Sequence, residues 1–193
     1  VSGRGFLGFA TVAMTENATG RVTTLSYNQT YPLTGTVSGS QVVANGAVLG
    51  TTSTTYATIQ PYPGFSVFQV VPATEKRSVY SSDGTFGYTI RKQFQYDQYG
   101  NTALISDLGD INSTTDDVYT CIRYNNDPIQ WRLGYMAQQQ VSNTLASCQQ
   151  FLTASSPSWD PVNTLEWILN SYDGAMNVTQ RAYPVIEKSG ILW

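Results

Sequence analysis

Hydrophobic and polar residues alternate along residues 88–96, and this alternation predicts a β-strand with one buried face. Polar residues occupy the odd positions, and Lys92 is the one exception among the even positions. The other even positions carry hydrophobic side chains: Tyr88, Ile90, Phe94 and Tyr96. A period of two places alternate side chains on the same face of a strand. Residues 22–27 and 51–59 also favour strands, because they are rich in β-branched and aromatic residues.

Dipeptides between these runs are typical of tight hairpin turns. Asn45-Gly46 and Asp83-Gly84 each lie between apolar arms, and Gly100-Asn101 follows the long strand. Such pairs accept the positive φ angles that match the twist of paired strands. Helix is arguable only at residues 144–152 and 164–172, where a helical period fits about as well as any other. A parallel α/β sheet is therefore disfavoured, and we predict an all-β fold of successive antiparallel hairpins.

The composition indicates a neutral polar surface. The 193 residues are 41% hydrophobic but only 12% charged, against a usual charged share of about 25%. The net charge of −3 provides no basic field for a phosphate backbone, so nucleic acid is not an expected partner. The absence of histidine removes histidine-based triads and histidine-ligated zinc, and we expect no cofactor. The longest apolar stretch, residues 6–14, is too short to span a membrane.

Two features bear on the compartment of the protein. Cys121 and Cys148 are the only cysteines, and they form either one disulfide in an oxidising compartment or two buried thiols. Four sequons would carry glycans if the chain passed through a eukaryotic secretory route. Their asparagines are Asn17, Asn28, Asn112 and Asn177.

A short unit occurs twice along the chain, in residues 94–102 and 169–179. Each copy has Tyr-Asp, then three residues, then Asn. The residues of the two units are Tyr96, Asp97, Gly100 and Asn101 in the first, and Tyr172, Asp173 and Asn177 in the second. Tyrosine can pack at the end of a strand, aspartate can cap the turn, and glycine or asparagine can take the left-handed position. We expect a structural role for these units, with repeated hairpins stacking edge to edge.

The two units, together with the start of the chain, resemble the tyrosine-aspartate (YD, or Rhs) repeat proteins, and more closely the B-component-like proteins of insecticidal toxin complexes. The start resembles the way into the repeat shell of that family through Gly3, Arg4, Gly5, Phe6, Gly8 and Phe9. Later landmarks keep the family's order, at residues 73–76, 96–101, 124–127, 131–134 and 172–173.

The resemblance implies a curved or spiralling sheet that forms part of a hollow β-shell around a toxic polypeptide. Residues 1–193 would then be one YD-repeat-like region of a longer secreted protein, with residues 1–60 leading into the shell and residues 61–193 forming hairpin repeats. The implied partners are neighbouring YD repeats of the same or a partner chain, and an enclosed polypeptide or glycan. Two departures are that Met176 replaces an expected glycine and that the Asp-Pro self-cleavage region has no counterpart, so a complete capsule or its protease is not expected.

Other motifs allow chemical interpretations as well as structural ones. An acidic cluster could be a solvated loop or a calcium site, and it comprises Asp107, Asp110, Asn112, Asp116 and Asp117. A second group could be a carbohydrate platform, an acid pair or packed tryptophans, and it comprises Trp159, Asp160, Glu166 and Trp167. The spacing Gly3-x-Gly5-x-x-Gly8 superficially matches a dinucleotide fingerprint, but a strand-like run follows where a helix is required.

Three functions follow from these patterns. The leading hypothesis is a non-catalytic structural segment of a YD-repeat wall, with no enzymatic activity. The alternative is a teneurin-like cell-surface module for adhesion or glycan recognition. A third, an acid-pair glycosidase, would need two carboxyl groups about 5 to 9.5 Å apart in one cleft.

Overall fold

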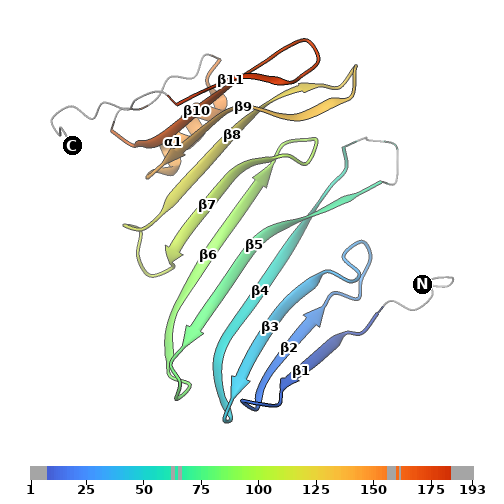
Figure 1. Ribbon diagram of the computed structural model, residues 1–193, viewed down its shortest axis with the longest axis vertical. Helices are drawn as coiled ribbons and strands as arrows, with labels where there is room; N and C mark the ends of the chain where they lie inside the picture. Colours follow the sequence, from blue (N-terminus) through green and yellow to red (C-terminus); the bar gives the residue numbers. More distant parts are fainter. Residues whose placement is uncertain (1–7, 62–63, 65–66, 156–159, 161, 184–193) are drawn as a thin grey trace. The chain divides into compact units, whose positions relative to one another are not determined.

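The strands of the chain follow one another across a single open antiparallel sheet, in the same order as in the sequence (Figure 1). The computed structural model describes residues 8–61, 64, 67–155, 160 and 162–183. The strands in these residues are β1 (Thr11–Glu16), β2 (Arg21–Tyr27), β3 (Val37–Ala44), β4 (Ala47–Ile59), β5 (Gln69–Tyr80), β6 (Phe86–Tyr96), β7 (Thr102–Asp110), β8 (Val118–Asp127), β9 (Arg132–Ser142), β10 (Thr164–Tyr172) and β11 (Val178–Ala182). The predicted all-β fold of successive hairpins is confirmed.

The predicted hairpin turns form where local sequence dictates them. Asn45 and Gly46 have φ angles of 51° and 78° and join β3 to β4, with Ala44 paired to Ala47. This is the two-residue turn that matches the twist of the flanking strands. Between β5 and β6, the Asp83 carboxylate accepts a hydrogen bond from the Thr85 backbone N–H at 2.9 Å. The Asn-Gly turn is confirmed as predicted. The Asp-Gly pair also lies in a hairpin connection, but Tyr80 pairs with Phe86 across residues 81–85, and only Gly84 of the pair has a positive φ, 86°, so a two-residue turn there is wrong.

One of the two candidate helices forms and the other does not. Helix α1 spans Leu145–Thr153, and its N-cap Thr144 accepts a hydrogen bond from the Ser147 backbone N–H, as helix starts require. Residues 164–172 instead form strand β10, so a helix there is wrong. The backbone of β10 pairs with β9 on one side and with β11 on the other, and this pairing outweighs a weak local preference.

Contacts divide the chain into two compact units, which we call unit 1 and unit 2. Unit 1 comprises Val1–Gln93 with Gly109–Asn112, and unit 2 comprises Phe94–Leu108 with Ser113–Trp193. In the described part of unit 1, Val71 is the only buried hydrophobic side chain. Strand pairing and cross-strand hydroxyl contacts hold this unit together, for example Ser40 with Thr52 at 2.8 Å. The described part of unit 1 is therefore one sheet layer without a hydrophobic core of its own.

The alternation predicted along β6 holds at its end, where Phe94 and Tyr96 are half-buried and Gln93 and Gln95 exposed, but not at its start. Thr89 is 8% exposed, whereas its neighbour Tyr88 is 45% exposed. The Thr89 hydroxyl lies 2.7 Å from that of Ser78 on β5, and its carbonyl accepts a hydrogen bond from the Ile111 backbone N–H. The prediction of a buried tyrosine at position 88 is wrong, because neighbouring residues cover Thr89 and not Tyr88.

The hydrophobic core of the described residues lies in unit 2, where α1 packs on β8 and β9 (Figure 1). Its members are Leu104, Cys121, Cys148 and Phe151, with Tyr119 and Leu152 packed against them. The Arg123 guanidinium donates to the Phe151 and Ala154 carbonyls at 3.3 and 2.8 Å, which places a cation at the C-terminal end of the helix. The helix thus packs on β8 and β9, two of the strands that lie between the two Tyr-Asp units in the sequence.

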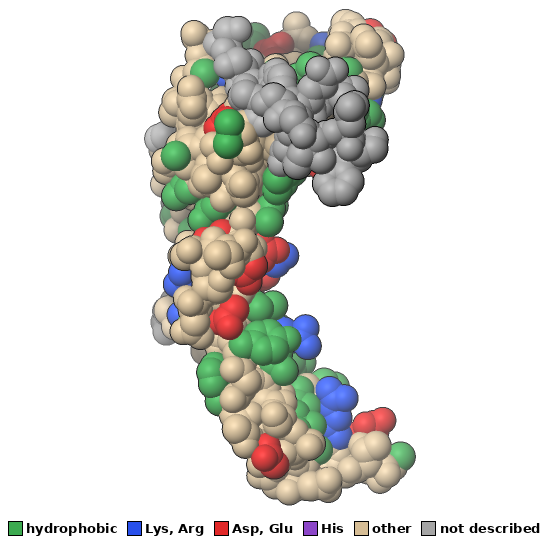
Figure 2. Space-filling model, turned by 90° about the vertical axis from the view of Figure 1, so that its left-hand side faces the viewer, with side chains coloured by type: hydrophobic (Ala, Val, Ile, Leu, Met, Phe, Trp, Pro, Cys, Tyr) green, Lys and Arg blue, Asp and Glu red, His purple; other side chains and the backbone are tan. Residues whose placement is uncertain are grey.

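The surface matches the composition. Figure 2 shows a face made mostly of uncharged polar side chains and backbone, with hydrophobic and charged side chains scattered over it. No helix among the described residues is long and apolar enough to cross a membrane.

Candidate functional site: the aspartate–asparagine turns

The first Tyr-Asp unit forms a turn that its aspartate closes from inside. Asp97 lies between β6 and β7, and its Oδ1 accepts hydrogen bonds from the backbone N–H groups of Tyr99 and Asn101, both at 2.9 Å. Its Oδ2 accepts from the Asn101 side-chain amide at 2.9 Å. Gly100 takes the left-handed position with φ 87°. The asparagine closes the turn through its side chain instead of adopting a positive φ.

The second unit repeats this geometry between β10 and β11. The Oδ1 of Asp173 accepts from the backbone N–H groups of Ala175 and Asn177, both at 2.9 Å, and its Oδ2 accepts from the Asn177 side-chain amide at 3.0 Å. Met176 occupies the position of Gly100, with φ 66°. The repeated sequence pattern is therefore a repeated three-dimensional unit with the same set of donors and acceptors.

A polar network extends the first turn across the next strands. The Asn126 amide on β8 donates to the Oδ2 of Asp97 at 2.9 Å, and its carbonyl oxygen accepts from the Gly134 backbone N–H on β9 at 2.8 Å. Gly134 has φ 81°, and a Cβ there would lie 2.9 Å from the side-chain oxygen of Asn101. Only glycine fits this position without strain. Asp97 thus connects its turn to β8 directly and to β9 through Asn126.

Tyrosine hydroxyls provide a second kind of link between neighbouring strands. Tyr172 of the second unit donates to the Met136 carbonyl at 2.7 Å, and its ring meets that of Tyr135 edge to face at a centroid distance of 5.7 Å. Tyr124 donates to the Thr102 carbonyl at 3.0 Å. Tyr96 of the first unit lies half-buried at the end of β6. The hydroxyls of Tyr172 and Tyr124 are bound to backbone, which is a structural role.

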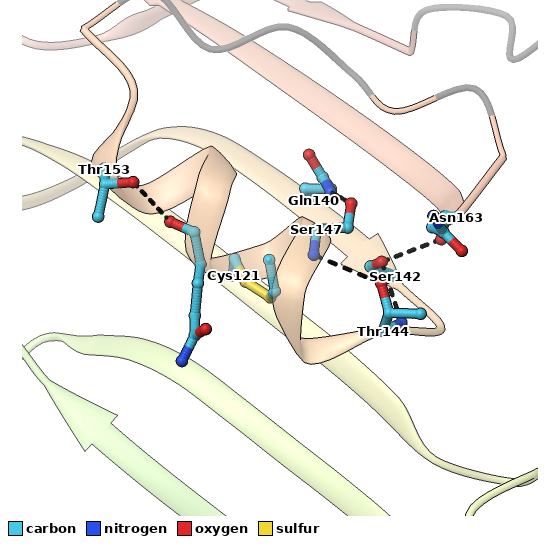
Figure 3. Close-up of a disulfide and its surroundings, with 9 residues drawn as sticks. Cys121, Gln140, Ser142, Thr144, Ser147, Thr153 and Asn163 are labelled. Carbon is cyan, nitrogen blue, oxygen red and sulfur yellow. Dashed lines mark hydrogen bonds between the residues drawn. A yellow bond between two sulfur atoms is a disulfide. The ribbon is translucent and has the colours of Figure 1, made fainter.

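The two cysteines are joined by a disulfide, Cys121 on β8 to Cys148 on α1, with their Cα atoms 5.7 Å apart (Figure 3). Both are fully buried. Beside them the Gln140 amide donates to the Ser147 hydroxyl at 2.9 Å, which links β9 to the helix. The disulfide and this contact attach α1 to the sheet.

The acidic residues of the predicted cluster lie at the end of β7 and in the segment that follows it, and they have different partners. In unit 1, the carboxylate of Asp110 accepts from both the backbone N–H and the side-chain amide of Asn112 at 3.0 Å. In unit 2, Asp117 accepts from the Tyr119 hydroxyl at 3.1 Å, and Asp107 lies in β7. Within the described residues, no group of three or more carboxylates and cysteines could hold a metal ion. Asp116 is exposed.

The group around Asp160 also forms a turn. Its carboxylate accepts from the Val162 and Asn163 backbone N–H groups and from the Asn163 side-chain amide. Trp167 is half-buried and Glu166 exposed on β10. Trp159 lies outside the described residues. The carboxylate of Asp160 is therefore engaged with its own loop.

The structure describes only part of the predicted motif at the start of the chain. Gly3, Arg4, Gly5 and Phe6 lie outside the described residues, whereas Gly8 has φ 87° and Phe9 is exposed.

The sequon asparagines differ in their contacts. Asn17 is exposed in the turn between β1 and β2. The Asn28 amide donates to the Thr36 hydroxyl at 2.9 Å. Asn112 and Asn177 donate to their turn aspartates. At Asn28, Asn112 and Asn177 one N–H of the side-chain amide is already engaged, so a glycan there would have to replace the other N–H.

Sequence reasoning missed the roles of Asn126, Gly134 and the Asp160–Asn163 pair. The spacing Asp-x-x-Asn marks the last of these, one residue shorter than the repeated unit. Residues 124–127 stand out in the sequence only as a landmark of resemblance. The contact of Asn126 with Asp97 spans 29 residues, so no local pattern could have paired them.

Comparisons with known proteins do not assign the chain to a family. It matches no protein-family model and no curated protein.

Replacing Met176 by glycine is expected to stabilise unit 2 by about 1 kcal/mol, because a side chain in the left-handed region costs roughly 1–2 kcal/mol. The measurement is urea unfolding followed by tryptophan emission. All four tryptophans belong to unit 2, so the signal reports on that unit. The matched variant is Gly100→Ala in the first turn, which should destabilise by a similar amount. A Met176→Gly protein less stable than the unchanged one would contradict the equivalence of the two turns.

Acid is expected to weaken the turns. The pKa of Asp173 is lowered from its ordinary value of 3.8, first by the Asn177 amide, and the pKa of Asp160 is lowered first by the Asn163 amide. A folded-state pKa below the unfolded one contributes stability that is present above the unfolded value and lost as the pH falls through the folded value. Urea midpoints should therefore fall below about pH 4. The Asp173→Asn variant should lose less stability over this range, and an equal loss would show that protonation of Asp173 does not contribute to it.

Proposed function

We propose that the chain is a structural, non-catalytic segment of a YD-repeat wall, extended at its edges by further strands and placed around an enclosed polypeptide. The observation that carries this proposal is the repetition of one turn geometry, at Asp97 and Asp173, within a sheet whose strands follow sequence order. In such a sheet each added hairpin extends the same layer. The function of the chain is then to form an uninterrupted part of the wall.

The burial pattern supports the proposal. A single layer with Val71 as the only buried hydrophobic side chain of described unit 1 gains little from the hydrophobic effect on its own. Further strands at its edge would add the missing pairing. Among the strands that the structure describes, β1 pairs with β2 alone and β11 pairs with β10 alone. Edges of this kind present unpaired backbone groups that favour strand addition.

The disulfide supports a secreted location as part of the same proposal. Disulfides persist in oxidising compartments and are rare where thiols are kept reduced. The polypeptide inside the wall would contact side chains that are mostly uncharged, in keeping with the 12% charged content.

Sedimentation velocity of the chain over a range of concentrations tests the proposal. We expect reversible association at high protein concentration, because both edges offer backbone groups to another copy. A double variant with Ala13→Lys in β1 and Thr179→Lys in β11 places charges on the two edges and should remain monomeric. As a matched control, Glu166→Lys in the paired strand β10 should associate like the unchanged chain. A monomer at all concentrations in the unchanged chain would contradict the proposal.

A further inference from the structure

The two Asp-Asn turns differ in one donor. In the first turn, the Oδ2 of Asp97 accepts two side-chain amides, from Asn101 of its own turn and from Asn126 of β8, both at 2.9 Å. In the second turn, the Oδ2 of Asp173 accepts one amide, from Asn177 at 3.0 Å. No described residue supplies the second amide to Asp173. The other turn-closing hydrogen bonds of the two aspartates correspond one to one.

The difference follows from position in the sheet. The strand that carries Asn126 is β8, which pairs with β7, the strand that leaves the first turn. The strand that leaves the second turn is β11, and among the described strands it pairs only with β10. Asp97 and Asn101 are accordingly half-buried, whereas Asp173 and Asn177 are exposed. The second turn therefore has the geometry of the first before its covering strand is added.

We infer that the outer edge of β11 binds an antiparallel β-strand whose asparagine side chain donates to the carboxylate of Asp173, as Asn126 donates to Asp97. This inference rests on the proposed function, since it specifies the strand that extends the wall. The occupant is a strand of the β8 kind, with a carboxamide near its C-terminal end. Charge favours it, because a carboxylate acceptor strengthens a hydrogen bond from an amide donor.

The register of the occupant follows from that of β8. Cys121 faces Leu104, and Asn126 comes five residues after Cys121 in the sequence. Asn101 and Asn177 occupy equivalent positions in the two turns. Leu104 lies three residues after Asn101, and Gln180 lies three residues after Asn177, so Gln180 corresponds to Leu104. The asparagine of the incoming strand should therefore lie five residues beyond the residue that faces Gln180. Residues 178–193 contain no asparagine, so the donor is a residue outside this segment.

The strand that follows in the partner has a requirement of its own. The side-chain oxygen Oδ1 of Asn126 accepts from the Gly134 backbone N–H, and Gly134 cannot carry a side chain without meeting Asn101. A partner hairpin that repeats this arrangement has glycine eight residues after its asparagine. Asparagine, seven residues, glycine is thus the sequence pattern expected in the segment that covers the second turn.

A peptide titration tests the inference. The probe is a peptide of residues 118–127 with Cys121→Ala, blocked at both ends, and the matched control carries Asn126→Ala as well. Each is added to the isotope-labelled chain, and backbone amide shifts of β11 and of the Asp173 turn are followed. We expect the asparagine peptide to bind at least about tenfold more tightly than the alanine peptide, because it alone can donate a hydrogen bond to the charged carboxylate.

Substitution of the acceptor completes the test. In Asp173→Asn the preference should fall to about threefold or less, whereas Asp160→Asn, in a turn away from the β11 edge, should leave it unchanged. Unaltered amide shifts of β9 establish that Asp173→Asn is folded. Equal binding of both peptides at β11 would overturn the inference while leaving edge extension intact. No shift of β11 at millimolar peptide would also overturn it, and the sedimentation experiment judges the proposed function separately.

Discussion

Replacing Cys121 and Cys148 together by alanine is expected to lower the free energy of unfolding of unit 2 by about 3–4 kcal/mol. The disulfide closes a loop with a sequence separation of 27 residues, and it removes the corresponding entropy from the unfolded chain. It also attaches α1 to β8 beside the only described hydrophobic core. The measurement is urea unfolding of the variant and of the unchanged chain, monitored by tryptophan emission.

Two controls accompany the cysteine variant. Reduction and alkylation of the unchanged chain should shift the midpoint in the same direction. Amide exchange in β2, β3 and β4, which belong to unit 1, should change little, because the lost cross-link lies in unit 2. A reduced chain with an unchanged unfolding midpoint would show that α1 contributes little to the stability of the sheet.

Replacing Asp97 by alanine is expected to lower the free energy of unfolding of unit 2 by about 3 kcal/mol. The change removes an acceptor of four hydrogen bonds from a half-buried site and leaves the amides of Asn101 and Asn126 without their carboxylate. Asn126 also connects to Gly134 on β9, so the loss should extend beyond the turn. Urea unfolding followed by tryptophan emission again gives the change in free energy.

The second turn supplies the matched comparison. Asp173→Ala removes the same turn bonds but no contact to a covering strand, and its cost should be clearly smaller than that of Asp97→Ala. Asn126→Ala should cost less after Asp97→Ala than in the unchanged chain, because the two residues share one network. Equal costs for Asp97→Ala and Asp173→Ala would show that the cross-strand network contributes nothing.

Local turn chemistry accounts for most of the predicted fold. Asn45-Gly46 and Asp83-Gly84 specify their turns through φ angles and side-chain capping that depend only on neighbouring residues. The strands expected at residues 22–27 and 51–59 form within β2 and β4. Thr144 begins α1 as a cap, which is again a local effect. Where neighbouring residues alone determine the backbone, the sequence is a sufficient guide.

Elements that depend on distant strands escaped prediction. Residues 164–172 carry an ambiguous period, and pairing with β9 and β11 makes them a strand. The burial of Thr89 instead of Tyr88 depends on Ser78 and Ile111, which come from other parts of the chain. Asn126 was not predicted as part of the site, because its contact with Asp97 joins residues far apart in the sequence. Both turns could be predicted from the repeated Tyr-Asp pattern.

Hydrogen–deuterium exchange of β1 and β11 at low and high protein concentration shows whether the two edge strands are covered by further strands. If the chain is a wall segment extended by further strands, backbone amides of these edge strands should exchange quickly in dilute solution and become protected as copies associate. The central strands β3, β4 and β9 should be protected at both concentrations. Edge amides that are equally exposed at every concentration, in a chain that stays monomeric, would contradict the account.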